Sequence, residues 1–415
     1  MNVRDRLERM TEYGMLHLPP RADPHEAGER PDLRPFQPAK TPRGVTWVRR
    51  ELFPADHIHG NMSLGSLRSH PTGALSLLTG GERPPDDWTD LLFLDTETTG
   101  LSTGTGTYVF LVGLAHLTAG GEVEVEQYLM PDPSGEQAFL IAVAERLDTF
   151  DHLASFNGKS FDLPLLSHRY TMNRMRAQLE FTGHCDLLHP ARNLWRRVLP
   201  SCSLASLESH RLEVNRIDDI PGSEVPARYF LFLSDGNFDH LAPVVRHNTL
   251  DLISSVALTA HMLQVAEGPG GTEEALALGR MARRAGDHDR ANAYFSDVLE
   301  ESESLSALAV AAEELSRWLK REDRWDEAVD LWSWMIERIE ASELGLTAGP
   351  FPYIEMAKYC EHRSRDLDSA LQYTRRAISS VRRQSQIGPR SRRQMSELQH
   401  RLRRVQRKIT TRSRT

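Results

Sequence analysis

Two acidic residues follow directly on a short apolar run, Leu91-Leu92-Phe93-Leu94. A continuous apolar run of this length predicts a buried central strand. Asp95 and Glu97 are two positions apart, so on an extended backbone both side chains leave the same face. Adjacent carboxylates repel each other unless a cation lies between them, and oxygen ligands of this kind suit Mg²⁺ or Mn²⁺. The alternative is a strand end that turns into solvent with two exposed acids.

A second motif, Asn157-Gly158-Lys159-Ser160-Phe161-Asp162, follows a short strand predicted over residues 152–156. The Asn-Gly turn and the helix predicted after it place Asp162 in the first helical turn. A third carboxylate at the sheet edge would suit the same site, but the helix dipole alone also favours aspartate there. Lys159 could pair with a phosphate or could simply be solvated.

A third motif lies in an apolar helical pattern that runs to Val265. His247 and Asp251 are four residues apart, so they share one face of the predicted helix. Beside a metal ion, such a pair could orient a water and supply a ligand. A local hydrogen bond between the two on the helix surface is the alternative.

The elements that must position these motifs alternate between strands and helices. Residues 108–117 and 122–130 predict two strands joined as a hairpin by a turn at 118–121, and a helix is predicted to begin at Pro133. Residues 44–53 also alternate like a strand. This order predicts an α/β mixed sheet with helices on its faces.

The composition indicates a folded chain of more than one domain. It has 415 residues, of which 40% are hydrophobic and 26% charged. No apolar run approaches the roughly 20 residues that span a bilayer, and charges stand where a signal peptide needs an apolar core. The three cysteines lack metal-ligand spacing. We therefore expect a cytoplasmic protein that does not act at a membrane.

The C-terminal third predicts an all-α region after a linker at 267–272. Alanines 291, 328 and 370 each follow a charged turn, and their spacing is close to, but longer than, the tetratricopeptide period of about 34 residues. Such repeats could dock a protein partner or a nucleic acid, or could simply stabilise the chain. From Arg375 onward the sequence is arginine-rich with one acid, Glu397, although the net charge is −8. This basic segment predicts phosphate binding, with a solvated charged helix as the alternative.

The three motifs together resemble those of the DEDD exonuclease superfamily, which has the ribonuclease-H-like fold. The stretches DTETTGLSTGTGTYVFLVGLA, NGKSFDLPLL and HNTLD are most similar to YprB-type ribonuclease-H-like proteins, over roughly residues 89–266. The resemblance gives an exonuclease domain (89–266), and the sequence pattern around it predicts an N-terminal, partly disordered extension (1–88), tetratricopeptide-like repeats (273–383) and a basic helix or tail (384–415).

The resemblance implies a two-metal nuclease, with 3′–5′ exonuclease action on DNA or RNA. By position, the two Mg²⁺ or Mn²⁺ ions are held by four carboxylates, Asp95, Glu97, Asp162 and Asp251, and the general base is His247. Nucleic acid is then the partner, contacted by Thr98, Thr99, Gly100, Leu101, Asn157 and Lys159.

One spacing departs from the family pattern. The histidine branch of the superfamily places its base five residues before the last aspartate, whereas His247 lies four before Asp251, as in the tyrosine branch. Asn248 or a metal-bound hydroxide is therefore an alternative to His247. A catalytically silent nucleic-acid-binding or scaffold protein and a structure-specific endonuclease are the alternative functions, since fold alone does not give activity.

Overall fold

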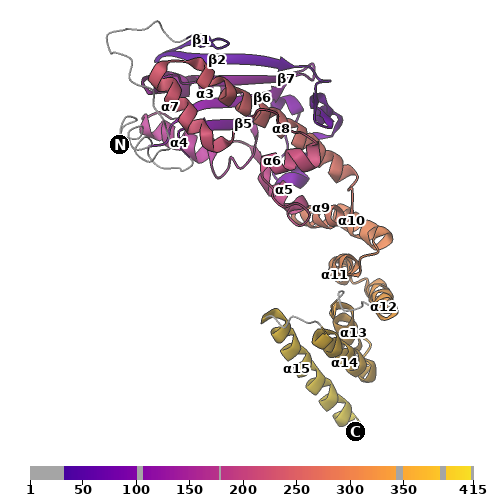
Figure 1. Cartoon of the computed structure of the whole chain (residues 1–415). Coiled ribbons are helices and arrows are strands. Elements are labelled where there is room, and N and C mark those ends of the chain that lie inside the picture. Colours follow the sequence, from indigo (N-terminus) through magenta and orange to yellow (C-terminus); the bar gives the residue numbers. More distant parts are fainter. Residues whose placement is uncertain (1–31, 101–105, 177–178, 343–348, 384–388, 413–415) are drawn as a thin grey trace. The chain divides into compact units, whose positions relative to one another are not determined.

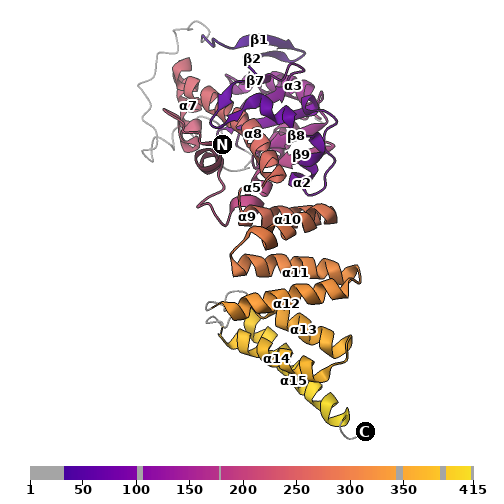
Figure 2. The same ribbon diagram turned by 90° about the vertical axis from the view of Figure 1, so that its right-hand side faces the viewer.

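The chain divides into two compact units, Met1–Gly268 and Pro269–Thr415. The computed structural model, drawn in Figures 1 and 2, describes residues 32–100, 106–176, 179–342, 349–383 and 389–412. Each unit has a hydrophobic core of its own. Leu101, one of the predicted substrate contacts, lies outside the described residues.

A seven-stranded mixed sheet forms the centre of the first unit (Figure 1). Its strand order is β1-β2-β7-β6-β5-β8-β9, with β5 antiparallel to β6 and parallel to β8. The strands are β1 (Gln37–Thr41), β2 (Gly44–Phe53), β5 (Leu91–Thr98), β6 (Val109–Leu117), β7 (Val123–Leu129), β8 (His152–Ser155) and β9 (Gly183–Asp186). The predicted mixed sheet with flanking helices is thereby confirmed. A separate two-stranded ribbon is formed by β3 (Ile58–His59) and β4 (Met62–Ser63).

The helices of the first unit cover both faces of the sheet. They are α2 (Leu75–Thr79), α3 (Glu136–Leu147), α4 (Asp162–Met172), α5 (Leu188–Trp195), α6 (Leu204–Leu207), α7 (Val225–Asp235) and α8 (Ala242–Glu267). Neighbouring residues of β7 show the two faces, because side chains alternate along a strand. Gln127 donates to the carbonyl of Val245 in α8, whereas the Glu126 carboxylate binds Arg146 in α3. The central strand β5 is therefore enclosed, which explains its all-apolar start.

The α/β unit begins well before residue 89, where the sequence analysis placed the start of its domain. Strand β2 pairs antiparallel with β7 from Trp47 to Phe53, and β1 pairs with β2. Residues 37–53 thus complete the α/β unit, because the outer edge of β7 would otherwise expose unpaired backbone groups. The alternating pattern at 44–53 predicted the strand but not the sheet to which it belongs.

Helix α8 is long and apolar enough to cross a membrane by length and composition. However, 78% of the apolar window within Phe238–Glu267 is buried inside the protein. Leu252, Val256 and Leu263 are each at most 1% exposed. This burial is that of a core helix packed against a sheet, and it explains why the helix is apolar on most of its surface.

The second unit is all-helical, as predicted. Its helices are α9 (Thr272–Arg284), α10 (His288–Glu301), α11 (Leu305–Arg321), α12 (Trp325–Ala341), α13 (Phe351–His362), α14 (Leu367–Arg383) and α15 (Pro389–Arg412). Alanines 291, 328 and 370 are fully buried in α10, α12 and α14. Five positions before each of them the backbone is left-handed, at Gly286, Asp323 and Arg365. Three helix pairs therefore share one turn geometry.

The arginine-rich C-terminal segment is not a free tail. Leu398 and Val405 of α15 are buried at 3% and 0% exposure. Arg401, Arg404 and Lys408 all bind the carboxylate of Glu361 at the end of α13, at 2.6–2.9 Å. The sequence analysis placed a boundary at residue 384 between the helical repeats and the basic segment. That boundary is wrong for these residues, because α15 packs on the preceding helices through apolar contacts and ion pairs.

Glu361 gives a pH-dependent test of this packing. Burial alone would raise the pKa of Glu361, but hydrogen bonds from Arg404 and Lys408 lower it from 4.5 to about 2. A lowered folded-state pKa contributes stability above the unfolded value, and this contribution is lost as the pH falls toward 2. Glu361→Gln should therefore destabilise the helical unit by about 3 kcal/mol at pH 7. Thermal melts should show the difference from wild type shrinking between pH 4.5 and 2; a difference that does not change with pH would contradict the ion-pair role.

Candidate metal centre

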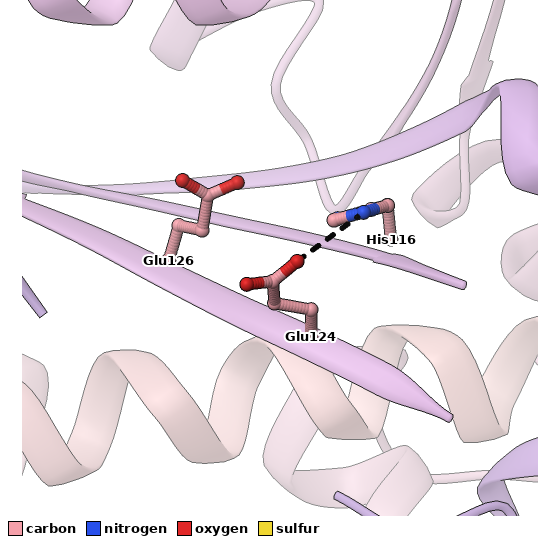
Figure 3. A group of neighbouring side chains, drawn as sticks. All are labelled: His116, Glu124 and Glu126. Carbon is pink, nitrogen blue, oxygen red and sulfur yellow. Dashed lines mark ion pairs between the residues drawn. The ribbon is translucent and has the colours of Figure 1, made fainter. Parts of the chain in front are cut away.

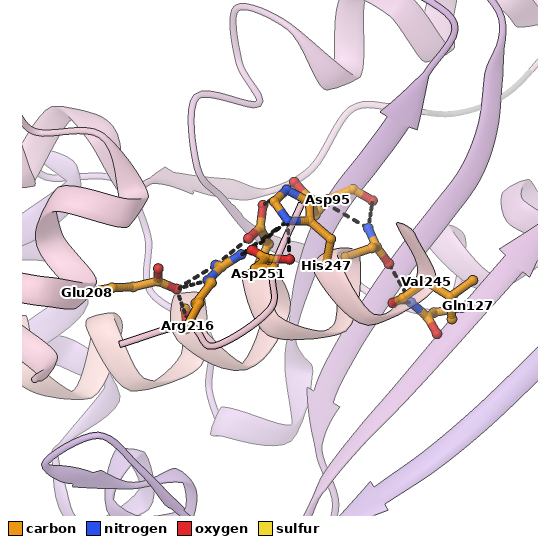
Figure 4. Close-up of polar contacts among 10 residues, drawn as sticks. Asp95, Gln127, Glu208, Arg216, Val245, His247 and Asp251 are labelled. Carbon is orange, nitrogen blue, oxygen red and sulfur yellow. Dashed lines mark hydrogen bonds and ion pairs between the residues drawn. The ribbon is translucent and has the colours of Figure 1, made fainter. Parts of the chain in front are cut away.

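Strand β5 carries Asp95 and Glu97 into the centre of the first unit. Both side chains point to the face covered by α8, where Asn248 Nδ2 donates to Asp95 Oδ2 at 2.8 Å (Figure 4). Glu97 is only 8% exposed. The exposed strand end weighed from the sequence is therefore wrong, because the sheet continues on both sides of β5 and α8 covers the acids.

Three neighbouring strands and α8 fix the position of Asp95. Asp95 is opposite Gly113 on β6, which is in turn opposite Gln127 on β7. Gln127 Nε2 donates to Asn248 Oδ1 at 2.8 Å, so Asn248 is oriented to offer its amide hydrogens to Asp95. A Cβ on Gly113 would lie 2.0 Å from Asn248 Oδ1. Glycine here allows the helix to approach the sheet closely enough for the Asn248–Asp95 hydrogen bond.

Asp162 reaches the same region from the start of α4. It is 4% exposed, and Thr96 Oγ1 donates to its Oδ1 at 2.5 Å. Asn157 before it has a left-handed backbone, with φ 68°, and its N–H donates to Asp186 at 2.8 Å. The predicted turn and helix start are confirmed. Thr96, which lies between Asp95 and Glu97 in the sequence, thus connects the first motif to the second.

The third motif is held by a loop that precedes α7. Arg216 in this loop binds Asp251 at 2.5 Å and Asp219 at 2.9 Å, and it also binds the buried Glu208 (Figure 4). His247 Nδ1 lies 2.9 Å from Asp219, and His247 Nε2 lies 3.8 Å from Asp251 Oδ2. Because a carboxylate only accepts, Nδ1 is the donor in the short contact with Asp219. The weighed alternative, a simple His–Asp pair on the surface, is wrong, because both residues are partly buried in a larger network.

The acids influence one another electrostatically. Burial raises the pKa of Asp95 well above its usual value, and the charges of Asp251 and Asp162 raise it further. Burial and the same neighbours, led by Asp95, raise the pKa of Glu97 in the same way. Burial also raises the pKa of Asp162, to about 6, against the hydrogen bond from Thr96. The carboxylates of the three motifs therefore lie close enough for their charges to influence one another's ionisation.

These residues fit a divalent cation by their chemistry. They offer only oxygen ligands, and such carboxylates suit Mg²⁺ and Mn²⁺. Among the residues described, Arg216 is the one cation that forms an ion pair with any of the four, and it binds Asp251. Within the described ranges, the side-chain hydrogen-bond partner of Asp95 is the neutral amide of Asn248. The negative charges of Asp95, Glu97 and Asp162 are therefore not compensated by an ion pair among the described residues, and a bound cation would neutralise them.

The predicted substrate contacts lie in or beside the loops around this region. Thr98 Oγ1 donates to the carbonyl of Gly100, and Thr99 Oγ1 accepts from the N–H of Tyr108. Lys159 Nζ binds Glu82 at 2.8 Å. The hydroxyls of Thr98 and Thr99 are therefore both engaged in hydrogen bonds to the backbone, and Lys159 is paired with an acid. Their contacts with substrate remain predictions.

The sequence analysis missed two residues of the network, Arg216 and Asp219. They lie in Arg216-Ile217-Asp218-Asp219, which has no periodicity or motif spacing. Burial opposes ionisation of Asp219, but hydrogen bonds from Arg216 and His247 lower its pKa. The clustered charges at 216–219 were a signal, but sequence alone does not reveal which helix they contact.

A different side-chain group on the sheet has ligand atoms within 4.8 Å of one another: His116, Glu124 and Glu126 (Figure 3). Its charges are already compensated. Glu126 binds Arg146 at 2.6 Å and Arg50 at 3.2 Å, and it accepts from the Tyr128 hydroxyl. Burial and then Arg146 lower the pKa of His116. This group is therefore explained as an ion-pair network between β6, β7 and α3.

The comparisons with known proteins agree with this geometry. Residues 92–263 match a family described as the RNase_H superfamily. The chain is 32% identical over 344 residues to a Bacillus subtilis (strain 168) protein, "Uncharacterized protein YprB". The match covers 80% of this chain and 80% of that protein. The chain belongs to the YprB family. Its α/β unit is thus ribonuclease-H-like, as the sequence motifs indicated.

A solved structure is also similar to this YprB-family chain. It is the family B DNA polymerase from the hyperthermophilic archaeon Pyrobaculum calidifontis, with 15% sequence identity and a TM-score of 0.35. The match covers 57% of this chain, and the chain spans only 30% of that polymerase's length. A similarity at this level carries no functional conclusion for the YprB-family chain.

Proposed function

We propose that the protein is a metal-dependent nuclease that hydrolyses phosphodiester bonds at the carboxylates of β5, α4 and α8. One observation carries the proposal. Glu97 and Asp162 are buried and Asp95 is partly buried; burial raises the pKa of all three, and neighbouring negative charges raise those of Asp95 and Glu97 further. This arrangement costs stability, so it is expected where function requires it. The ribonuclease-H-like family of the α/β unit supports the same conclusion.

The residues have distinct roles in this proposal. Asp95, Glu97, Asp162 and Asp251 would hold two Mg²⁺ or Mn²⁺ ions. When bound, such ions activate a water and stabilise the leaving oxygen. Asn248 holds Asp95 in place through its 2.8 Å hydrogen bond.

His247 is the proposed general base. Its Nε2 would accept the proton of the attacking water. Asp219 acts as a positioning residue, because its 2.9 Å contact with Nδ1 fixes the ring and the tautomer.

A cleavage assay tests the proposal directly. Single-stranded DNA and RNA oligonucleotides, labelled at the 5′ end, are incubated with the protein in Mn²⁺ or in chelator. We expect Mn²⁺-dependent products shortened stepwise from the 3′ end. Internal cuts at unpaired or branched positions would instead show an endonuclease. Tight binding without cleavage under any divalent metal would show a silent nucleic-acid-binding protein and contradict the proposal.

His247→Ala should lower the cleavage rate by about 10² to 10⁴-fold, because a positioned general base contributes this much. The matched control is His240→Ala, since His240 also pairs with an aspartate, Asp235, at 2.9 Å but lies at the entry to α8 outside the carboxylate cluster. Single-turnover rates at saturating substrate separate the chemical step from binding. Equal rates for wild type and His247→Ala would place the base elsewhere and favour Asn248 or a metal-bound hydroxide.

We further propose that the helical unit consists of tetratricopeptide-type helix pairs that dock a partner. The support is the repeated left-handed turn five positions before each fully buried alanine in α10, α12 and α14. Repeated helix pairs of this kind stack through nearest-neighbour contacts and present an extended surface for binding.

A further inference from the structure

A groove of about 520 Å³ lies between α14 and α15 in the helical unit. One wall is formed by four residues of α14, which are Arg375, Ile378, Ser379 and Arg382. The other wall is formed by three residues of α15, which are Gln399, Leu402 and Arg403. The groove therefore combines three arginines with two neutral hydrogen-bonding side chains and two aliphatic ones.

Helical periodicity explains how these residues come together. On α14 they are spaced i, i+3, i+4 and i+7, and on α15 they are spaced i, i+3 and i+4. Residues at these spacings share one face of a helix. Packing of α14 against α15 is fixed by buried aliphatic residues such as Val381 and Leu398, each 3% exposed. The three arginines are thus presented by two helices that an apolar contact holds together.

The charge in this groove is not compensated within the structure. Arg375, Arg382 and Arg403 are exposed, and within the described ranges no carboxylate forms an ion pair with any of them. Neighbouring cations behave differently. Arg376, the next residue on α14, binds Glu340 at 2.7 Å, and Arg404, the next residue on α15, binds Glu361 at 2.7 Å. Arg376 and Arg404 are thus each paired with an acid, whereas Arg375 and Arg403 beside them face the groove without an ion pair among the described residues.

We propose that this groove binds the sugar-phosphate backbone of a single-stranded nucleic acid. Guanidinium groups match phosphate oxygens with two parallel hydrogen bonds, so three of them in one groove suit successive phosphates. Ser379 and Gln399 add neutral hydrogen-bonding groups for sugar and phosphate oxygens, and Ile378 and Leu402 supply an apolar surface for the sugar or base. The inference rests on the proposed function in one respect: the choice of nucleic acid, among possible polyanions, as the ligand of the groove. It assigns the helical unit a binding site separate from the carboxylates.

The test measures binding by the full-length protein without cleavage. A fluorescein-labelled single-stranded 20-nucleotide oligonucleotide is titrated by anisotropy in chelator, over a series of KCl concentrations. The groove variant carries Arg375→Gln, Arg382→Gln and Arg403→Gln. The matched control carries Arg317→Gln, Arg324→Gln and Arg376→Gln, which removes three arginines from the same unit that are each paired with a surface acid. A third variant replaces the groove arginines with lysine and keeps the charge.

Each phosphate contact to a single strand contributes about 0.7 to the slope of log affinity against log salt. The groove variant should therefore lose about 2 from the slope. The control and the lysine variant should keep the wild-type slope. An equal slope for the groove variant and the control would overturn the proposal. A second result would also overturn it. If labelled polyglutamate bound the wild-type protein as tightly as the oligonucleotide does, and lost that binding in the groove variant, the groove would be a site for an acidic peptide.

A parallel cleavage assay in Mn²⁺ keeps the two proposals distinguishable. Loss of slope in the groove variant, with no cleavage by wild type in any divalent metal, would support the groove and contradict the nuclease function. Metal-dependent cleavage together with equal slopes would support the nuclease function and overturn the groove.

Discussion

Asp95→Asn should melt, in chelator, at or above the wild-type temperature, yet gain little from Mn²⁺ and cleave no substrate. Burial and the charges of Asp251 and Asp162 raise the pKa of Asp95 well above 3.8, so its ionised form opposes folding when no cation is present. Asparagine has nearly the same shape and can still accept from Asn248. It therefore relieves the repulsion without leaving a cavity, while removing one metal ligand.

The size and pH dependence of this effect follow from linkage. A raised folded-state pKa means that wild-type stability is greatest at low pH and falls as the pH rises through that pKa. The advantage of Asp95→Asn in chelator should therefore be present at pH 7 and disappear below about pH 4. In wild type, Mn²⁺ at a hundredfold excess over its dissociation constant should add about 2.7 kcal/mol. Paired melting curves with Mn²⁺ and with chelator measure both effects. An equal Mn²⁺ shift in the two proteins would show that Asp95 is not a ligand.

Gly113→Ala should destabilise the α/β unit by about 3 kcal/mol and lower cleavage about a hundredfold. The added Cβ would lie 2.0 Å from Asn248 Oδ1 and 2.7 Å from Leu252 Cδ1, so these two side chains of α8 must shift. A shift of the Asn248 amide weakens its hydrogen bond to Asp95. Denaturant unfolding and single-turnover cleavage measure the two effects.

The matched control is Gly135→Ala. A Cβ there meets no atom within 4 Å, and its φ of −85° is open to alanine. Its stability should equal or slightly exceed that of wild type. If Gly113→Ala behaves like this control, the close approach of α8 to β6 does not position the site.

The sequence predicted the elements that carry the acids because each has a strong local pattern. The apolar run before Asp95 became β5, the hairpin at 108–130 became β6 and β7, and Asp162 begins α4. The motif resemblance predicted that residues from three elements share one site, which hydrophobic periodicity alone could not predict. The helical C-terminal unit was likewise indicated by its charged turns and repeated alanines.

Long-range partners were not predictable in the same way. Strand β2 joins the sheet through β7, about 75 residues later, and nothing in either pattern specifies that pairing. Arg216 and Asp219 contact α8 from an irregular loop, and the choice of Asp219 as the partner of His247 depends on how that loop folds. The basic C-terminal segment was predicted as a helix or tail, but nothing in its pattern specifies that it packs onto α14 or pairs with Glu361 of α13.

Calorimetric titration of Mn²⁺ into the metal-free protein tests the central claim most directly, because it counts ions independently of any substrate. The account predicts two bound ions per wild-type chain, and fewer in Asp95→Asn, with His247→Ala unchanged in number. Binding of no ion by wild type, or of the same number by wild type and Asp95→Asn, would contradict the account.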